Sequence, residues 1–148
     1  FLNEKIKKIN VDLATVTTEV DLSEKNTSFH EYMKNNSTIL CFEDRFTPEQ
    51  AKIMAAVAMA ESAGDPMIDT VKSGLDPEKK NEFSIGLFQL NMIDAFLEER
   101  LKLFGIESTD ELYNPIVNVI AAKRLFDQQG FGAWSAYNNN SYKKFLTN

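Results

Sequence analysis

The clearest structural signal in the sequence is a helix that begins after Thr47. Thr47 is a good N-cap residue, Pro48 fits the first helical position, and Gln50 lies three residues after the cap. The run from Ala51 to Ala60 consists largely of strong helix formers, with apolar residues on two neighbouring faces. The helix should end near Ser62 to Gly64, with Asp65-Pro66 beyond it.

The remaining sequence predicts further helices around one short irregular region. Residues 65–84 contain two turn signals, Ser73-Gly74 and Asp76-Pro77, so a loop region with a small β-hairpin is expected over about 65–90. The fold should be mainly α-helical, with this hairpin as its small β element. Further helical segments are expected at 92–104, 108–112, 115–130, 132–137 and 141–146.

Composition excludes several classes of protein. The 148 residues, 43% of them apolar, suit one globular domain, and no apolar run approaches the roughly 20 residues of a membrane span. Cys41 and His30 are each the sole residue of their type, which rules out an intrachain disulfide. They also make a zinc site or a histidine-activated nucleophile improbable, so no metal and no cofactor is expected. The net charge of -6 disfavours nucleic-acid binding.

Glu61 is the first candidate for chemistry. It lies at the carboxyl-terminal end of the expected helix, after the apolar run Val57 to Ala60. Loss of hydration and the negative end of the helix both disfavour the charged carboxylate, so the pKa of Glu61 should be raised. A carboxyl that keeps its proton near neutral pH can act as a general acid. Taken alone, however, Glu61 fits better a solvated residue that ends an amphipathic helix.

Four short blocks give Glu61 a context. They are Ala60 to Pro66, Ser84 to Asn91, Leu112 to Asn118 and Ala133 to Asn138. In this order they resemble the lysozyme-like superfamily, specifically the soluble lytic transglycosylases and related phage virion proteins, over about residues 47–146. The resemblance implies an α+β lysozyme-like fold, in which a helical bundle surrounds a catalytic helix. It also implies an enzyme that cleaves the glycan strands of peptidoglycan.

The resemblance assigns roles to individual residues. Glu61 falls at the position of the catalytic acid, and Asn114 and Asn118 are expected to be structural. Trp134 could pack in the core or stack on a sugar, and the core is favoured, as it is for Phe83, Phe88, Phe126 and Phe131. Neutral hydrogen-bonding side chains suit the hydroxyl and acetamido groups of the substrate. The expected substrate-binding residues are Ser84, Gln89, Asn91, Tyr137 and Asn138.

Two reactions are compatible with these residues. Where animal lysozymes have a second acid, this sequence has Ser84, which cannot serve as nucleophile or base. The resemblance therefore favours a lytic transglycosylase, in which one Glu acts as acid and then as base and leaves a 1,6-anhydro product. Hydrolysis stays open, because an acidic side chain near Glu61 could hold a water molecule. The candidates are Asp65, Asp69, Asp76 and Glu82.

Residues 1–46 match no block of the family, so we divide the chain into an N-terminal arm or linker, 1–46, and a catalytic domain, 47–148. A short helix is possible at 28–35. The arm suits attachment to other virion proteins, or to a bacterial secretion apparatus as the second choice. The expected site of action is then the bacterial periplasm or cell wall, with the protein carried by a virion.

A different class of function stays open as well. The chain could be a catalytically inactive glycan-binding or structural virion domain that has kept the fold, or an unrelated helical interaction module. The acidic net charge is unfavourable for an enzyme whose substrate, peptidoglycan, is itself anionic.

Overall fold

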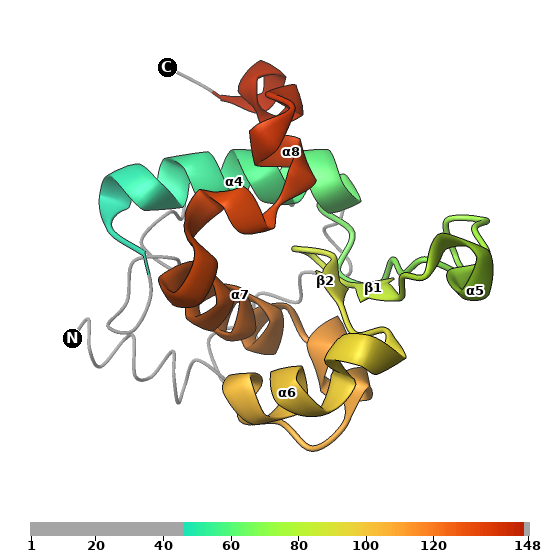
Figure 1. Ribbon diagram of the computed structural model, residues 1–148. Coiled ribbons are helices and arrows are strands. Elements are labelled where there is room, and N and C mark those ends of the chain that lie inside the picture. Colours follow the sequence, from blue (N-terminus) through green and yellow to red (C-terminus); the bar gives the residue numbers. More distant parts are fainter. Residues whose placement is uncertain (1–45, 147–148) are drawn as a thin grey trace.

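The structure, a computed structural model, describes residues 46–146 (Figure 1). The arm or linker expected over 1–46 lies outside the described residues except for Phe46, and so do the possible helix at 28–35, Cys41 and His30. The ring of Phe46 is buried and meets the ring of Phe126 edge to face, with 5.4 Å between their centroids. This contact anchors the start of the described chain in the core.

The expected first helix is present as α4, Pro48–Ser62. The Thr47 hydroxyl accepts a hydrogen bond from the Gln50 N–H, and the Gln50 side chain accepts one from the Thr47 N–H, so the predicted capping box is confirmed. The helix stops because Ala63 takes the left-handed conformation, and its N–H bonds to the carbonyl of Met59. The helix contributes to the core Ala51, Met54, Ala56, Val57 and Ala58.

The later helices follow the expected segments closely. In Figure 1, α4 crosses the upper part of the molecule, α7 lies between it and α6, which is at the bottom, and α8 crosses next to α4. The second expected helix starts at Asp94 rather than Met92, because the Asn91 side chain accepts the Ile93 N–H and Ile93 stays extended. The elements are α6 (Asp94–Phe104), η4 (Thr109–Tyr113), α7 (Pro115–Gln129), η5 (Gly130–Ala133), α8 (Ser135–Asn138) and η6 (Ser141–Phe145).

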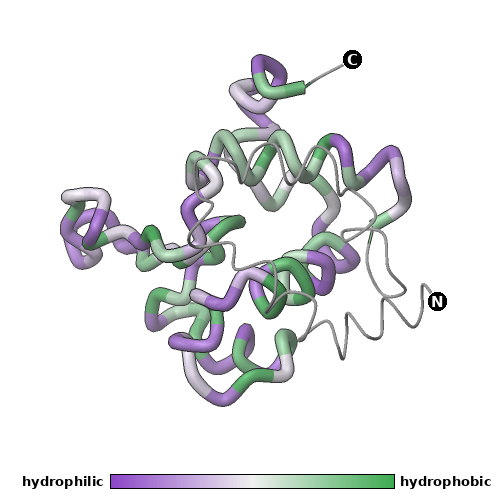
Figure 2. The backbone as a smooth tube through the Cα atoms, turned by 180° about the vertical axis from the view of Figure 1, so that it is seen from behind, coloured by the Kyte–Doolittle hydropathy of each residue, from purple (hydrophilic) through white to green (hydrophobic). Residues whose placement is uncertain are grey.

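The irregular region contains the expected hairpin. Strands β1 (Ser84–Ile85) and β2 (Leu90–Asn91) pair antiparallel, with Ser84 opposite Asn91. The expected turn at Asp76-Pro77 is instead the start of a short helix, α5 (Pro77–Lys80), because the Asp76 side chain caps its first turn. This part of the chain projects from the body of the molecule and is largely polar (Figure 2).

Asn118 connects the hairpin to the helices. Its side chain is fully buried on α7, and its amide nitrogen donates to the carbonyls of Ile85 at 3.0 Å and Leu112 at 2.9 Å. Its oxygen accepts the N–H of Phe88 at 2.9 Å. One amide therefore holds both sides of the hairpin turn and the end of η4, which confirms the structural role expected for Asn118.

Trp134 belongs to the core and not to a sugar-stacking surface. Its side chain is 3% exposed, and its indole N–H donates to the carbonyl of Phe88 at 2.9 Å. Phe88 is buried beside it, and the two rings meet edge to face. The other three phenylalanines expected in the core are half-buried and pack against it: Phe83, Phe126 and Phe131.

Gly86 provides a test of this packing. Its φ of 76° lies in the left-handed region, and a Cβ here would collide with the Asn118 side chain and the Leu112 carbonyl. We expect Gly86→Ala to lower the free energy of unfolding by more than about 3 kcal/mol. Gly74→Ala is the matched control, because Gly74 also has positive φ but open space around it. The control should cost only the backbone strain, about 1–2 kcal/mol. Urea denaturation measures both, and equal losses would contradict the role assigned to the Asn118 contact.

Candidate active site

Glu61 lies in the last turn of α4 and faces a cleft of about 430 Å³. The preceding turns of α4 bury their apolar side chains, which brings the half-buried carboxyl to the edge of the core. On the other side the cleft is bounded by the loop after α4 and by η6. Its lining consists of Met59, Ala60, Glu61, Ser62, Ala63, Ile68, Ser141, Lys144 and Phe145.

Ser62 explains why the helix ends directly after Glu61. The Ser62 hydroxyl donates to the carbonyl of Ala58 at 2.9 Å and accepts the N–H of Gly64 at 3.2 Å. The side chain therefore satisfies polar backbone groups at the end of the helix while itself remaining buried. In the Glu-Ser pair, the serine shapes the backbone and the glutamate is left to face the cleft.

The pKa of the Glu61 carboxyl is raised above its ordinary value. Burial is the largest cause, because it removes the hydration that the charged form needs. The backbone N–H of Ala136, which donates to Glu61 Oε2 at 3.3 Å, lowers the pKa and partly offsets burial. The negative charge of Glu82 raises it further. The direction expected from the sequence is confirmed, and a raised pKa is what a proton donor needs at neutral pH.

Glu82 and Ser84 form a hydrogen-bonded pair, and the charge of Glu82 acts on the Glu61 carboxyl. Ser84 is 2% exposed, and its hydroxyl donates to Glu82 Oε2 at 2.6 Å. The charge of Glu82, two residues before Ser84, raises the pKa of Glu61. The role of Ser84 in substrate binding stays a prediction, and its hydroxyl already bonds to Glu82.

Asp69 has a structural environment that sets it apart from Glu82. Burial alone would raise the pKa of Asp69, but hydrogen bonds from the Tyr113 hydroxyl and the backbone N–H of Lys72, with the charge of Lys72, lower it. The Tyr113 bond is 2.6 Å long, and burial together with Asp69 raises the pKa of Tyr113. Asp69 thus joins the loop after α4 to η4.

The other two acids considered from the sequence bind their own loops. The side chain of Asp65 accepts the N–H of Met67, and that of Asp76 accepts the N–H of Glu78. Of the four candidates for a second carboxylate, Glu82 is therefore the one whose charge acts on Glu61.

Gln89 lies close to the cleft. It has a positive φ of 45°, and its amide nitrogen donates to the carbonyls of Ile68 at 3.2 Å and Gly86 at 3.0 Å. Ile68 lines the cleft, so Gln89 connects the hairpin turn to the cleft wall. Its assignment as a sugar-binding residue stays a prediction that this position supports.

Tyr137 directly follows Ala136, the residue that donates to Glu61. Its ring is stacked between Phe131 and Tyr142, with centroid separations of 4.7 Å and 5.0 Å. This stack fixes the segment that carries the Ala136 N–H, and the expected closeness of the Tyr137 side chain to the Glu61 carboxyl stays a prediction. Direct contact of Tyr137 with a sugar stays a prediction.

The side chains of Asn91 and Asn138 form hydrogen bonds with backbone groups, and neither residue lines the cleft. The Asn91 oxygen accepts the N–H of Phe83 at 2.9 Å and also that of Ile93, which ties the outer ends of the hairpin together. The exposed Asn138 donates to the carbonyl of Gly132 at 3.0 Å. The structure thus gives each amide a local partner, and a role of either in substrate binding stays a prediction.

Sequence reasoning missed the wall of the cleft that η6 forms. Ser141, Lys144 and Phe145 were expected only as part of a short helix, without a role. The available signal was their position just after the Tyr-Asn pair, which the resemblance places beside the catalytic acid. Within residues 46–146, no three His, Cys, Asp or Glu side chains gather closely enough to bind a metal ion.

The comparisons with known proteins agree with this geometry. A family model described as a lysozyme-like domain matches residues 41–136, which is most of the chain. The chain therefore belongs to the lysozyme-like domain family, and this membership indicates an enzyme that degrades peptidoglycan. Neither the curated proteins nor the solved structures contain a match. No helix in the described part of the chain is long and apolar enough to cross a membrane.

The raised pKa of Glu61 predicts a change in stability. Because the folded protein holds this proton to higher pH than the unfolded chain does, the carboxyl favours folding at low pH. It opposes folding once the pH rises through its folded-state pKa. Glu61→Gln should therefore raise the melting temperature above that pKa, and the gain should vanish as the pH falls below 4.5. Thermal unfolding followed at several pH values measures this, and a loss of stability at neutral pH would contradict it.

Proposed function

We propose that the protein is a lytic transglycosylase that cleaves the β-1,4 bond between N-acetylmuramic acid and N-acetylglucosamine, with Glu61 as its catalytic residue. The proposal depends on one observation, a half-buried carboxyl with a raised pKa that faces a cleft. Membership of the lysozyme-like family supports the substrate class. The lack of an acid at Ser84 supports this reaction over hydrolysis.

The mechanism uses the Glu61 carboxyl twice. As an acid, it donates its proton to the glycosidic oxygen, and the bond to the muramyl anomeric carbon breaks. The resulting carboxylate is stabilised by the Ala136 N–H, which lies 3.3 Å from Oε2. As a base, it then takes the proton from the muramyl 6-hydroxyl while that oxygen attacks the anomeric carbon. The product is a 1,6-anhydro sugar, and Glu61 is protonated again.

Hydrolysis is the second candidate, and Glu82 is the observation that favours it. The Glu82 carboxylate is held by the Ser84 hydroxyl and acts electrostatically on Glu61. A second carboxylate in such a position can hold and activate a water molecule, which would then attack in place of the 6-hydroxyl. The products would carry reducing ends.

Product analysis tests the proposal. Purified protein incubated with peptidoglycan should release muropeptides with anhydro-muramyl ends, which mass spectrometry separates from reducing ends. Glu61→Gln should lower the rate by about 10²–10⁴-fold, because the amide cannot donate the proton. Release of reducing ends would replace the proposal with hydrolysis. Binding of peptidoglycan without any release would instead identify a catalytically inactive glycan-binding or structural domain.

The variant Glu82→Gln independently distinguishes transglycosylation from hydrolysis. In a transglycosylase this variant should keep most of its activity at acidic pH. The loss of activity at high pH should begin at lower pH than in the wild type, because removing the charge of Glu82 lowers the pKa of Glu61. Rates measured across the pH range show both effects. A loss of activity at every pH would instead support hydrolysis with Glu82 as the second catalytic group. Asp76→Gln is the control, since Asp76 caps α5.

We further propose that the enzyme opens the cell wall locally for a phage virion. The support is the resemblance of residues 128–138 to phage tail and internal virion enzymes. Action as part of a bacterial secretion system in the periplasm is the alternative. Antibodies against the chain should label purified virions from its natural source, and labelling of a cell-envelope apparatus instead would favour the alternative.

A further inference from the structure

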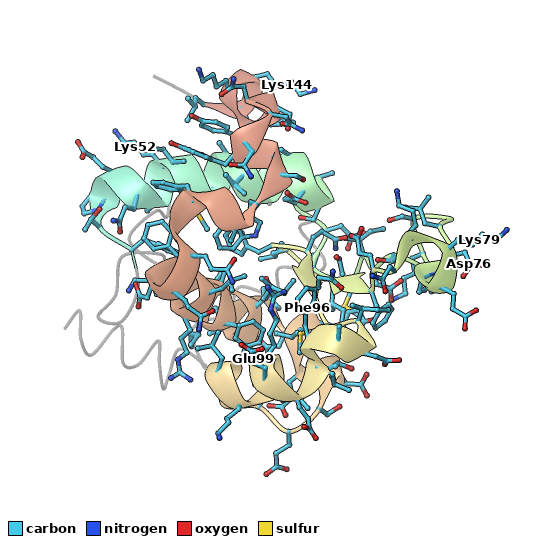
Figure 3. All side chains as sticks on the ribbon, viewed as in Figure 1. Lys52, Asp76, Lys79, Phe96, Glu99 and Lys144 are labelled. Atoms are coloured by element: carbon cyan, nitrogen blue, oxygen red, sulfur yellow. The ribbon has the colours of Figure 1, made fainter. Side chains whose placement is uncertain are left out.

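Lys144 is the cationic side chain among the residues that line the cleft. Lys144 lies on η6, and hydrogen bonds through Ala136 connect η6 to the Glu61 carboxyl. The Ser141 hydroxyl donates to the carbonyl of Ala136 at 3.4 Å, and the N–H of the same Ala136 donates to Glu61. Two contacts through one residue thus hold η6 in a defined place next to Glu61. Figure 3 shows Lys144 on this segment, which rises above α4.

The ammonium group of Lys144 is not used to neutralise Glu61. A cation close to a carboxyl lowers its pKa, but the charge that acts on the pKa of Glu61 is that of Glu82. Within the described part of the chain, Lys144 forms no ion pair. Its contact is with the ring of Phe145, whose centroid lies 5.5 Å from the ammonium nitrogen. Lys144 is therefore exposed beside the cleft with its charge available to a ligand.

The substrate class of the proposed function supplies a ligand for this charge. Every muramyl residue carries a lactyl carboxyl group, which is either free or extended by a stem peptide with carboxylates of its own. The protein as a whole has a net charge of -6, so its general field repels such a polymer. A cation at the cleft opposes this repulsion locally, where the strand must bind.

We propose that Lys144 binds a carboxylate of the muramyl residue or its stem peptide and thereby selects muramic-acid-containing strands over neutral glycans. This inference rests on the proposed function, because it assumes that the cleft beside Glu61 binds the glycan. Lys144 acts on binding and takes no part in proton transfer.

Binding measured without turnover tests the inference. In a Glu61→Gln background, titration calorimetry compares three ligands: a muramyl tetrasaccharide with stem peptides, the same sugar with the peptides removed, and chitotetraose, which has no carboxylate. Lys144→Gln should weaken binding of carboxylate-bearing ligands about fivefold at low salt, and added salt should reduce the difference. Binding of chitotetraose should not change. An effect on the peptide-free sugar alone assigns the lactyl carboxylate, which is ionisable only when no peptide is attached. An effect on the first ligand alone assigns the stem, and an effect on both means that a carboxylate of either origin binds Lys144.

The control variants separate a specific contact from net charge and from folding. Lys143→Gln removes the same charge from the same short helix, but Lys143 is not among the lining residues, so its effect should stay within twofold. Lys144→Arg should retain most of the affinity. Equal weakening by Lys143→Gln and Lys144→Gln, or equal weakening toward all three ligands, would overturn the inference alone. Failure of the Glu61→Gln protein to bind any of them would overturn the proposed function as well.

Discussion

The hydrogen bonds of the Asn118 amide are the constraint on which the arrangement of this domain depends. They join α7 to both sides of the hairpin turn and to the carbonyl of Leu112, in a place shielded from solvent. The close contact leaves no room for a side chain at Gly86. The hairpin turn then fixes Gln89 against the carbonyl of Ile68, one of the residues that line the cleft. Core packing and cleft shape are therefore coupled.

The fold places the Glu61 carboxyl in an environment that destabilises its charged form. A carboxyl at the end of a buried helix loses hydration, and the nearby charge of Glu82 adds repulsion, so its ionised form is disfavoured. The N–H of Ala136 compensates only in part. The same imbalance that opposes folding at high pH keeps a proton available for the glycosidic oxygen. Chemistry and stability are thus opposed at one residue, as is common at active sites.

Local signals in the sequence predicted the helices well, because caps act over a few residues: the Thr47 capping box and the stop at Gly105 both formed as expected. The raised pKa of Glu61 was predictable because burial, the dominant cause, follows from its apolar neighbours. Contacts between distant segments were not predictable. The approach of η6 to the end of α4, which brings Lys144 to the cleft, is of this kind. The Ser84–Glu82 bond was also missed, because the block pattern drew attention to Ser84 alone.

The protonation state of Glu61 is the central claim, and it can be measured directly. Carbon-13 labelling of glutamate and assignment of the Glu61 carboxyl through the Glu61→Gln spectrum allow its titration to be followed by NMR. The account predicts a midpoint above the ordinary value of 4.5, and a higher one than that of exposed glutamates in the same spectrum. A midpoint at or below 4.5 would mean that the carboxyl is well solvated and charged at neutral pH, which would contradict its assignment as the catalytic acid.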